Sequence, residues 1–280
     1  MPLKKRSALE LAKMGATIIV ISRNETKCQN TVDRIKRETG NENVDYFAAD
    51  LSLMSEIRNL VEVFKAKYSE LHVLLNNAGG IFSEQQLTDE GYEMTFALNH
   101  LNYFLLTHLL LDTIKVTAAT AGEARIVNVS SGAHNFVRDG IRFDDLQRSK
   151  DYGNFRVYSE TKLMNIMFTK ALARRLDGTN ITINALHPGF VNTGFGHNND
   201  GLLMKVFQLI TPFVSISAEQ GAETNIYLAS SREVKGVSGE YFDKKEVAKS
   251  NAASHDVEAQ ERLWQISEEL TGIAEPAGVV

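Results

Sequence analysis

The segment HVLLNNAG, residues 72–79, changes from a strand pattern to a turn pattern within a few residues. An apolar run, Val73 to Leu75, is followed by Asn76 and Asn77 and then by a small Ala-Gly pair. A short apolar run bounded by turn residues is typical of a buried strand. We therefore predict a strand over 72–79 that runs into a turn at its carboxyl end.

The segments on either side of 72–79 alternate in the same way. Apolar runs predict further strands at 16–22, 43–50, 124–131 and 181–189. Helical patterns predict helices at 24–40, 55–68, 90–115, 158–176, 218–230 and 256–272. Such alternation predicts an α/β fold, a parallel sheet with helices on both faces. Ligands bind beyond the carboxyl ends of the strands in these sheets, so we expect functional residues directly after each strand.

Composition narrows the class of protein. The chain has 280 residues, a net charge of −5 and one cysteine, Cys28. The charge gives no reason to expect nucleic acid as a partner. A single cysteine excludes an internal disulfide framework and fits a reducing compartment. We expect a cytoplasmic protein, with peripheral membrane association as the alternative.

Two kinds of segment are not expected. The apolar runs at 101–111 and 202–216 are shorter than the ~20 residues that span a bilayer, so we expect no transmembrane segment. The seven histidines lack the spacing of metal ligands, so we predict no metal site.

Tyr158 and Lys162 stand four residues apart in YSETK (158–162), within a helical pattern. Residues at this spacing share a helix face, with Cβ atoms about 5–6 Å apart. A phenol has a pKa of about 10, which must fall by roughly 3 units for acid–base work near neutral pH. An ammonium at about 5 Å supplies on the order of 3 kcal/mol toward that shift. The spacing suits a catalytic tyrosine, although a surface tyrosine beside a solvated lysine is the alternative for this motif alone.

Four motifs occur in order on the predicted elements: NNAG (76–79), NVSS (128–131), YSETK (158–162) and HPGFVNTG (187–194). In this combination the chain resembles the short-chain dehydrogenases/reductases, from about Ala8 to the C-terminus. ALELAKMGA (8–16), ALNHLNYFLLT (97–107) and LWQISEELTG (263–272) resemble the retinol-dehydrogenase-like branch, which includes the WW-domain oxidoreductases. The resemblance implies a single Rossmann-like, doubly wound domain over residues 1–280.

The resemblance implies roles for four side chains in alcohol–carbonyl chemistry. Tyr158 would act as general acid/base with Lys162, and Ser131 would hydrogen-bond the substrate oxygen, with Ser130 as the fallback. Asn99 would anchor a water that links to Lys162, and a buried amide satisfied by backbone is the alternative. The segment 135–155 resembles an insertion of the retinol-like branch, and we expect it to border the substrate pocket.

The resemblance also implies a dinucleotide site. Lys162 would bond the nicotinamide ribose beside Tyr158, and Asp50 would accept a hydrogen bond from adenine, with Leu51 nearby. The remaining residues implied at the cofactor are Asn77, Ala78, Gly79, Pro188, Gly189, Val191 and Thr193. Ser22 and Arg23 stand where a carboxylate would favour NAD, so we favour NADP(H). A solvated surface charge is the alternative for Arg23.

The chain lacks the first strand and the glycine-rich turn, TGxxxGxG, with which the family normally opens. We expect the missing strand at the centre of the sheet, between 16–22 and 72–79, which leaves two apolar edges unpaired. Either the domain is N-terminally incomplete or the protein is a variant that has lost dinucleotide binding. We predict that these 280 residues bind NADPH poorly.

The expected function is NADP(H)-dependent interconversion of an alcohol and its carbonyl on a small lipophilic substrate of retinoid, steroid or aldehyde type. The apolar segment 202–216 stands where family members carry a substrate lid, and an ordinary packed helix is the alternative. A non-catalytic interaction or regulatory protein is the alternative function. A homodimer through the helices of Asn99 and Tyr158 is expected from the resemblance, although retinol-like members include monomeric and membrane-bound forms.

Overall fold

The computed structural model describes residues 3–189 and 218–273. Within them the strands form two sheets rather than one. β1 (Ile18–Ser22) pairs in parallel with β2 (Val44–Ala48). The second sheet has the order β3-β4-β5-β6-β7. Its strands are β3 (Val73–Asn76), β4 (Ala124–Val129), β5 (Ile181–His187), β6 (Tyr241–Asp243) and β7 (Glu246–Val247), and only the β6–β7 pair is antiparallel.

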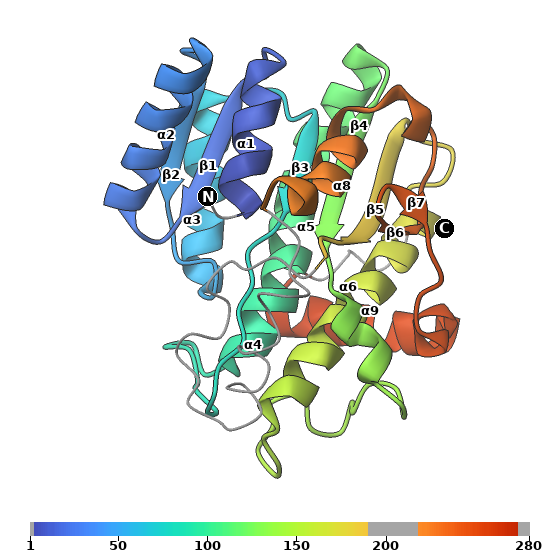
Figure 1. The fold of residues 1–280 in the computed structure, drawn as a ribbon. Helices are drawn as coiled ribbons and strands as arrows, with labels where there is room; N and C mark the ends of the chain where they lie inside the picture. The colour runs from blue at the N-terminus through green and yellow to red at the C-terminus, as the bar shows by residue number, and fades with distance from the viewer. Residues whose placement is uncertain (1–2, 190–217, 274–280) are drawn as a thin grey trace.

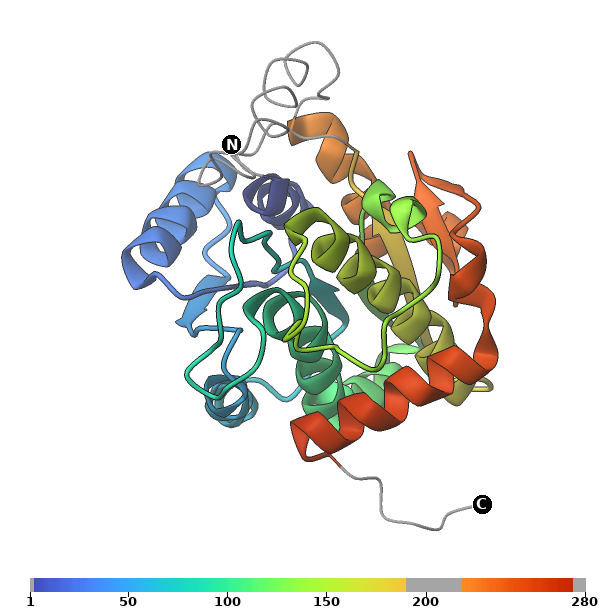
Figure 2. The same cartoon turned by 90° about the horizontal axis from the view of Figure 1, so that it is seen from below.

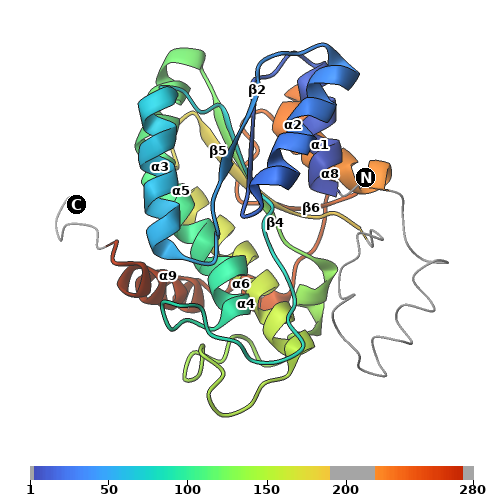
Figure 3. The ribbon, with the colours of Figure 1, turned by 90° about the vertical axis from the view of Figure 1, so that its left-hand side faces the viewer.

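Helices cover both faces of the strands, as the sequence predicted (Figure 3). One face carries α1 (Leu3–Lys13), α2 (Glu25–Thr39) and α8 (Ala218–Ser230). The other carries α3 (Met54–Lys67), α5 (Asn102–Ala121) and α6 (Asn154–Arg175). Short helical turns complete the fold: α4 (Met94–Phe96), η1 (Ala97–Leu101), η2 (Gly132–Phe136), η3 (Arg232–Val234) and η4 (Ala252–His255). The fold is therefore the expected Rossmann-like α/β arrangement (Figure 1).

Most predicted elements form, with shifted ends. The helix predicted at 90–115 begins at Met94, is interrupted by the π-helical turn η1 and continues to Ala121. α6 begins at Asn154 rather than at Tyr158. β6 and β7 were not predicted, because strands of two or three residues carry too little pattern to be recognised. Local signals fixed α2, where the Asn24 side chain accepts a hydrogen bond from the Lys27 N–H and Gly40 ends the helix with φ of +70°.

The main hydrophobic core lies between the larger sheet and the helices α3, α5 and α6. α9 (Val257–Thr271) closes it from outside, and Figure 2 shows this helix in red across α5 and α6. Its Trp264 packs against Phe104 of α5 and Phe168 of α6 at ring distances of 5.1 and 5.9 Å. This part of α5 and α6 is therefore not available to a second copy of the chain, and the homodimer stays a prediction.

The helical stretch Met94–Ala121 is long and apolar enough to span a membrane by length and composition. Tyr103, Phe104, Leu105 and Ile114 within it are fully buried in the main core. A core helix of a folded domain meets the same criterion, so this stretch is accounted for by the packing just described.

A groove separates the two sheets. Within the described residues β1 pairs only with β2, and β3 pairs only with β4, so each has one open edge. The groove between them has a volume of about 1230 Å³ and is lined by both strands and by apolar side chains such as Leu11, Phe64 and Leu106. The two sheets are joined instead through α1, whose Ser7 hydroxyl accepts a hydrogen bond from Asn225 of α8. The open slot that the sequence predicted between β1 and β3 is thus present among these residues, with one unpaired edge on each sheet.

Candidate active site

Ser131 and Tyr158 meet beyond the carboxyl end of β4. Ser131 caps η2 and accepts a hydrogen bond from the Ala133 N–H at 3.2 Å. Tyr158, in the second turn of α6, is hydrogen-bonded to the Ser131 side chain. The predicted pair therefore shares one site, although 27 residues separate the two in the sequence (158 − 131 = 27).

Lys162 lies one turn further along α6 and is buried. Its Nζ donates to the Val129 carbonyl at 3.0 Å and stands 5.6 Å from the centre of the Tyr158 ring. Ser130 is buried beside it, and its hydroxyl donates to the Lys162 carbonyl at 2.7 Å. Ser130 therefore joins β4 to α6, whereas Ser131 is the serine that faces the tyrosine.

Burial controls the titration of both catalytic groups. It raises the pKa of Tyr158 to about 12, and the hydrogen bond from Ser131 acts in the opposite direction. It lowers the pKa of Lys162 to about 7, because an ammonium loses its hydration inside the protein. Burial thus opposes the shift that the sequence analysis expected beside Lys162, and an acidic phenol at this site stays a prediction. The site by itself holds a protonated phenol, and ionising it requires further positive charge.

Asn99 lies in η1, the π-helical turn, which places its side chain against the turn that follows β3. The Asn99 Oδ1 accepts from the Gly80 N–H at 2.8 Å, and its Nδ2 donates to the Gly80 carbonyl at 2.9 Å. Nδ2 also donates to the Thr161 hydroxyl at 3.0 Å. These are the contacts of a buried amide that the protein itself satisfies, and the water relay to Lys162 stays a prediction.

The turn Asn77–Gly79 passes between the groove and the catalytic lysine. Asn77 and Ala78 line the groove, as does Leu51. A Cβ atom at Gly79 would lie 3.1 Å from the Asn99 Oδ1 and 3.3 Å from the Lys162 Nζ. A side chain at Gly79 would therefore crowd the catalytic groups, which explains the glycine physically.

The residues predicted at the adenosine end lie after β1 and β2. Arg23 is 74% exposed, and its Nη1 lies 3.8 Å from the Asp50 Oδ2. The Asp50 Oδ1 accepts from the Ser52 N–H and hydroxyl at 2.9 and 2.7 Å. Ser22 lines the groove at the end of β1. The exposed Arg23 side chain can therefore reach a bound phosphate. The same exposure also fits the alternative prediction, in which Arg23 is a solvated surface charge.

The segment after β5 is described only in part. Pro188 and Gly189 follow directly on His187, and Gly189 has φ of +78°, a conformation that glycine adopts at no cost. Val191, Thr193 and the predicted lid at 202–216 lie outside the described residues.

The residues present fit one end of a dinucleotide better than its middle. The small turn Asn77–Gly79 lines the groove at residues 77 and 78 and runs close to Lys162, and the exposed Arg23 suits a phosphate on the adenosine ribose. The sequence has no TGxxxGxG turn, and the groove between β1 and β3 is open where such a turn would lead into a helix. Among the described residues, a pyrophosphate in this groove would therefore meet no such turn.

Sequence reasoning missed the partners of two side chains at the site. His187 accepts a hydrogen bond from the Gly132 N–H at 3.1 Å and so supports the turn after Ser131. Glu160 lies between Tyr158 and Lys162 and is fully buried. Both stand inside quoted motifs, yet nothing in the motifs indicates their partners. No group of metal-ligating side chains occurs among residues 3–189 and 218–273.

Comparisons with known proteins agree with this geometry. Residues 4–142 and 146–201 match the family described as short chain dehydrogenase. Human polyprenol dehydrogenase is 37% identical over 95% of this chain and 81% of its own length. Human retinol dehydrogenase 12 is 38% identical over 96% of this chain and 83% of its own length. A solved structure from Mycobacterium Paratuberculosis, an uncharacterized protein, has a TM-score of 0.76 at 29% identity and covers 98% of this chain and 91% of that chain. Other solved structures of this fold are complexes with NAD or with NADPH.

Proposed function

The chain belongs to the short-chain dehydrogenase family of NAD(P)-dependent oxidoreductases, and we propose that it interconverts a lipophilic alcohol and its carbonyl with NADP(H). The observation that carries the proposal is the hydrogen-bonded pair Ser131 and Tyr158 with Lys162 one helical turn away.

In the proposed reaction the bound nicotinamide supplies or accepts the hydride. Ser131 donates a hydrogen bond to the substrate oxygen and holds it against Tyr158. In the direction of reduction the Tyr158 hydroxyl gives its proton to that oxygen as the carbonyl becomes an alcohol. A phenol with a pKa near 12 holds its proton at neutral pH, which suits this donor role. The positive charge of the oxidised cofactor adds to that of Lys162 and favours the phenolate in the reverse direction.

Arg23 supports the choice of NADP(H). A guanidinium at the end of β1 can make charge-assisted hydrogen bonds to a ribose 2′-phosphate. A carboxylate in its place would favour the 2′-hydroxyl of NAD instead. Because solved structures of the fold hold either cofactor, the preference rests on Arg23 and Ser22.

The proposal of a lipophilic substrate rests on the chain's similarity to its relatives. Those reported above are named for retinol and polyprenol, which are both long apolar alcohols. The retinoid, steroid and aldehyde classes predicted from the sequence are likewise lipophilic alcohols or carbonyl compounds.

A Tyr158→Phe substitution tests the proposal. The assay uses an extended enzyme, in which an apolar strand and a TGxxxGxG turn are added ahead of residue 1, with retinaldehyde and NADPH. Loss of the proton donor should lower kcat by about 10²–10⁴-fold. Tyr68→Phe is the matched control, because Tyr68 ends α3 and its hydroxyl donates to Asp45 at 3.0 Å rather than to a catalytic group. Undiminished reduction by the Tyr158→Phe enzyme would show that the catalytic assignment is wrong.

The open groove favours a second candidate function, an interaction or regulatory protein that keeps the fold without turnover. This alternative predicts that the extended enzyme shows no carbonyl reduction at all, with or without Tyr158. The same assay therefore separates the two functions.

A further inference from the structure

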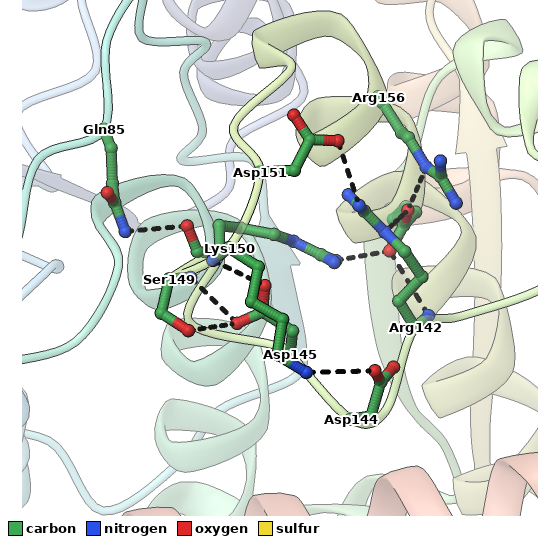
Figure 4. Close-up of polar contacts among 10 residues, drawn as sticks. Gln85, Arg142, Asp144, Asp145, Ser149, Lys150, Asp151 and Arg156 are labelled. Atoms are coloured by element: carbon green, nitrogen blue, oxygen red, sulfur yellow. Dashed lines mark hydrogen bonds and ion pairs between the residues drawn. The ribbon is translucent and has the colours of Figure 1, made fainter.

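Glu160 is a fully buried carboxylate in the catalytic helix, two residues from both Tyr158 and Lys162. Three arginine side chains are paired with it. Two of them, Arg142 and Arg156, are labelled in Figure 4. The Glu160 Oε1 accepts from the Arg142 Nε at 3.1 Å and from the Arg156 Nε at 3.0 Å. The Oε2 is paired with Arg148. None of these contacts has a part in the proposed reaction.

The carboxylate of Glu160 lies on a different face of α6 from the side chains of Tyr158 and Lys162. Residues two apart on a helix do not face each other. The hydrogen bonds and ion pairs that the structure gives for this carboxylate go to Arg142, Arg148 and Arg156. Glu160 therefore acts on the segment that carries Arg142 and Arg148, and its charge is balanced there.

That segment, residues 142–152, depends on Glu160 for its burial. Arg148 is 2% exposed, and its Nε and Nη1 have no hydrogen-bond partner. Its backbone also has a positive φ of 58°, which is uncommon outside glycine. A buried guanidinium without its carboxylate is strongly unfavourable, so Glu160 holds Arg148 inside. Asp145 orders the rest of the segment by accepting from Ser149 N–H and hydroxyl at 2.8 and 2.9 Å.

The opposite edge of the 142–152 segment meets the turn after β3. The Tyr152 hydroxyl donates to the Phe82 carbonyl at 2.9 Å. Gln85 Nε2 donates to the carbonyls of Gln147 and Arg148 at 2.9 and 3.0 Å.

The Phe82 end of this turn connects back to the catalytic groups. A Cβ atom at Gly80 would lie 3.4 Å from the Phe82 ring. The Asn99 side chain accepts a hydrogen bond from the Gly80 N–H and donates one to the Gly80 carbonyl. The 142–152 segment thus contacts α6 through Glu160 and contacts the turn after β3 through Tyr152. That turn passes Lys162, which is also a residue of α6.

We propose that Glu160 is a positioning residue that fixes the 142–152 segment as a wall of the substrate site and thereby sets the affinity for a bulky lipophilic substrate. The inference rests on the proposed function for its substrate. The ordering of the segment by Glu160 can be measured without any activity.

The first measurement follows the segment itself in the 280-residue chain. Glu160→Gln should increase tryptic cleavage within 142–152, mapped by mass at sites such as the exposed Lys150, by about fivefold or more because the segment opens more often. Glu261→Gln is the matched control. Glu261 also binds two arginines of α6, Arg174 and Arg175, but at the other end of the helix. Cleavage within 142–152 should be unchanged in the control.

The second measurement uses the extended enzyme. Glu160→Gln should raise the KM for retinaldehyde by about tenfold and leave kcat within about twofold, because a loosened wall weakens binding rather than chemistry. The pH profile of kcat should be unchanged. Glu261→Gln should alter neither constant. If Glu160→Gln does not fold, Arg142→Gln removes one partly exposed arginine and should give the same changes at smaller size.

Two results would overturn the proposal: cleavage and KM that stay at wild-type values, or a fall in kcat with a shifted pH profile at constant KM. The second result would place Glu160 in the chemistry. If no variant or wild-type enzyme reduces a carbonyl while the cleavage difference persists, the proposed function fails but the ordering of the segment by Glu160 stands.

Discussion

Two regions of the same molecule differ in how completely they are packed. At β4 and α6 every strand residue from Ala124 to Val129 is buried, and Tyr158, Ser131 and Lys162 are held by direct hydrogen bonds. At β1 only Ile18 is buried, and the open edges of β1 and β3 face a groove of about 1230 Å³. The first region carries the proposed proton chemistry, and the second would carry the middle of the cofactor.

The contrast shows that a catalytic arrangement can be complete while its neighbouring binding site is open. The catalytic groups belong to β4, α6 and η1, which share one core with α5 and α9. The groove edges depend on a strand that these residues do not provide. Each half can therefore be perturbed separately.

The largest expected difference concerns packing. Phe104→Ala should lower the free energy of unfolding by about 3–5 kcal/mol, because Phe104 is fully buried against Phe168 and Trp264. Ile21→Ala, at the groove, should cost only about 1–2 kcal/mol, since Ile21 is half-buried. Urea unfolding of both variants measures the two values. Equal costs would mean that the groove is closed in solution.

A pair of serine variants sharpens the description of the catalytic half. Ser131→Ala should lower kcat of the extended enzyme by about 10²–10³-fold, because the substrate oxygen loses a hydrogen-bond donor. Ser130→Ala removes only the bond to the Lys162 carbonyl and should cost about 1 kcal/mol of stability with little change in kcat. The reverse ranking in steady-state kinetics would make Ser130 the substrate ligand.

The role of the groove in cofactor binding can be tested by adding a strand and a glycine-rich turn to the chain. The chain as it stands should bind NADPH poorly, and the extended enzyme should bind it about 100-fold more tightly in calorimetry, because the added backbone N–H groups hold the pyrophosphate. NADPH should also bind more tightly than NADH. An extension with the glycines of the turn replaced by valine is the control and should not bind. Tight NADPH binding by the unextended chain would contradict this reading of the groove.

A pH dependence of stability tests the catalytic region in a further way. The folded-state pKa of Lys162 is about 7 and lies below the unfolded value, so the folded chain binds fewer protons between about pH 7 and 10. The free energy of unfolding should therefore rise with pH across this range, by up to about 1.4 kcal/mol per pH unit, before Tyr158 reverses the trend above about pH 10. Thermal unfolding of wild type and Lys162→Met at several pH values measures it. A wild-type slope equal to that of the variant would show that Lys162 is hydrated in solution.

Much of the site could be predicted from short sequence patterns because its residues follow strands or share a helix turn. Tyr158 and Lys162 are local to one helix, and Ser131 follows a strongly apolar strand. The partners of Glu160 could not be predicted, because Arg142 and Arg148 reach it through an irregular segment with no periodic pattern. The pKa directions were also out of reach, since burial of Tyr158 depends on elements distant in the chain.

By itself the sequence determined the alternation of strands and helices, the parallel pairing of β1 with β2 and of β3, β4 and β5, and the residues that meet at the strand ends, because these follow from local hydrophobic period and chain direction. Only the tertiary structure decided that α9 covers α5 and α6, and that burial raises the pKa of Tyr158. Those outcomes depend on distances between segments far apart in the chain, and no local pattern encodes them.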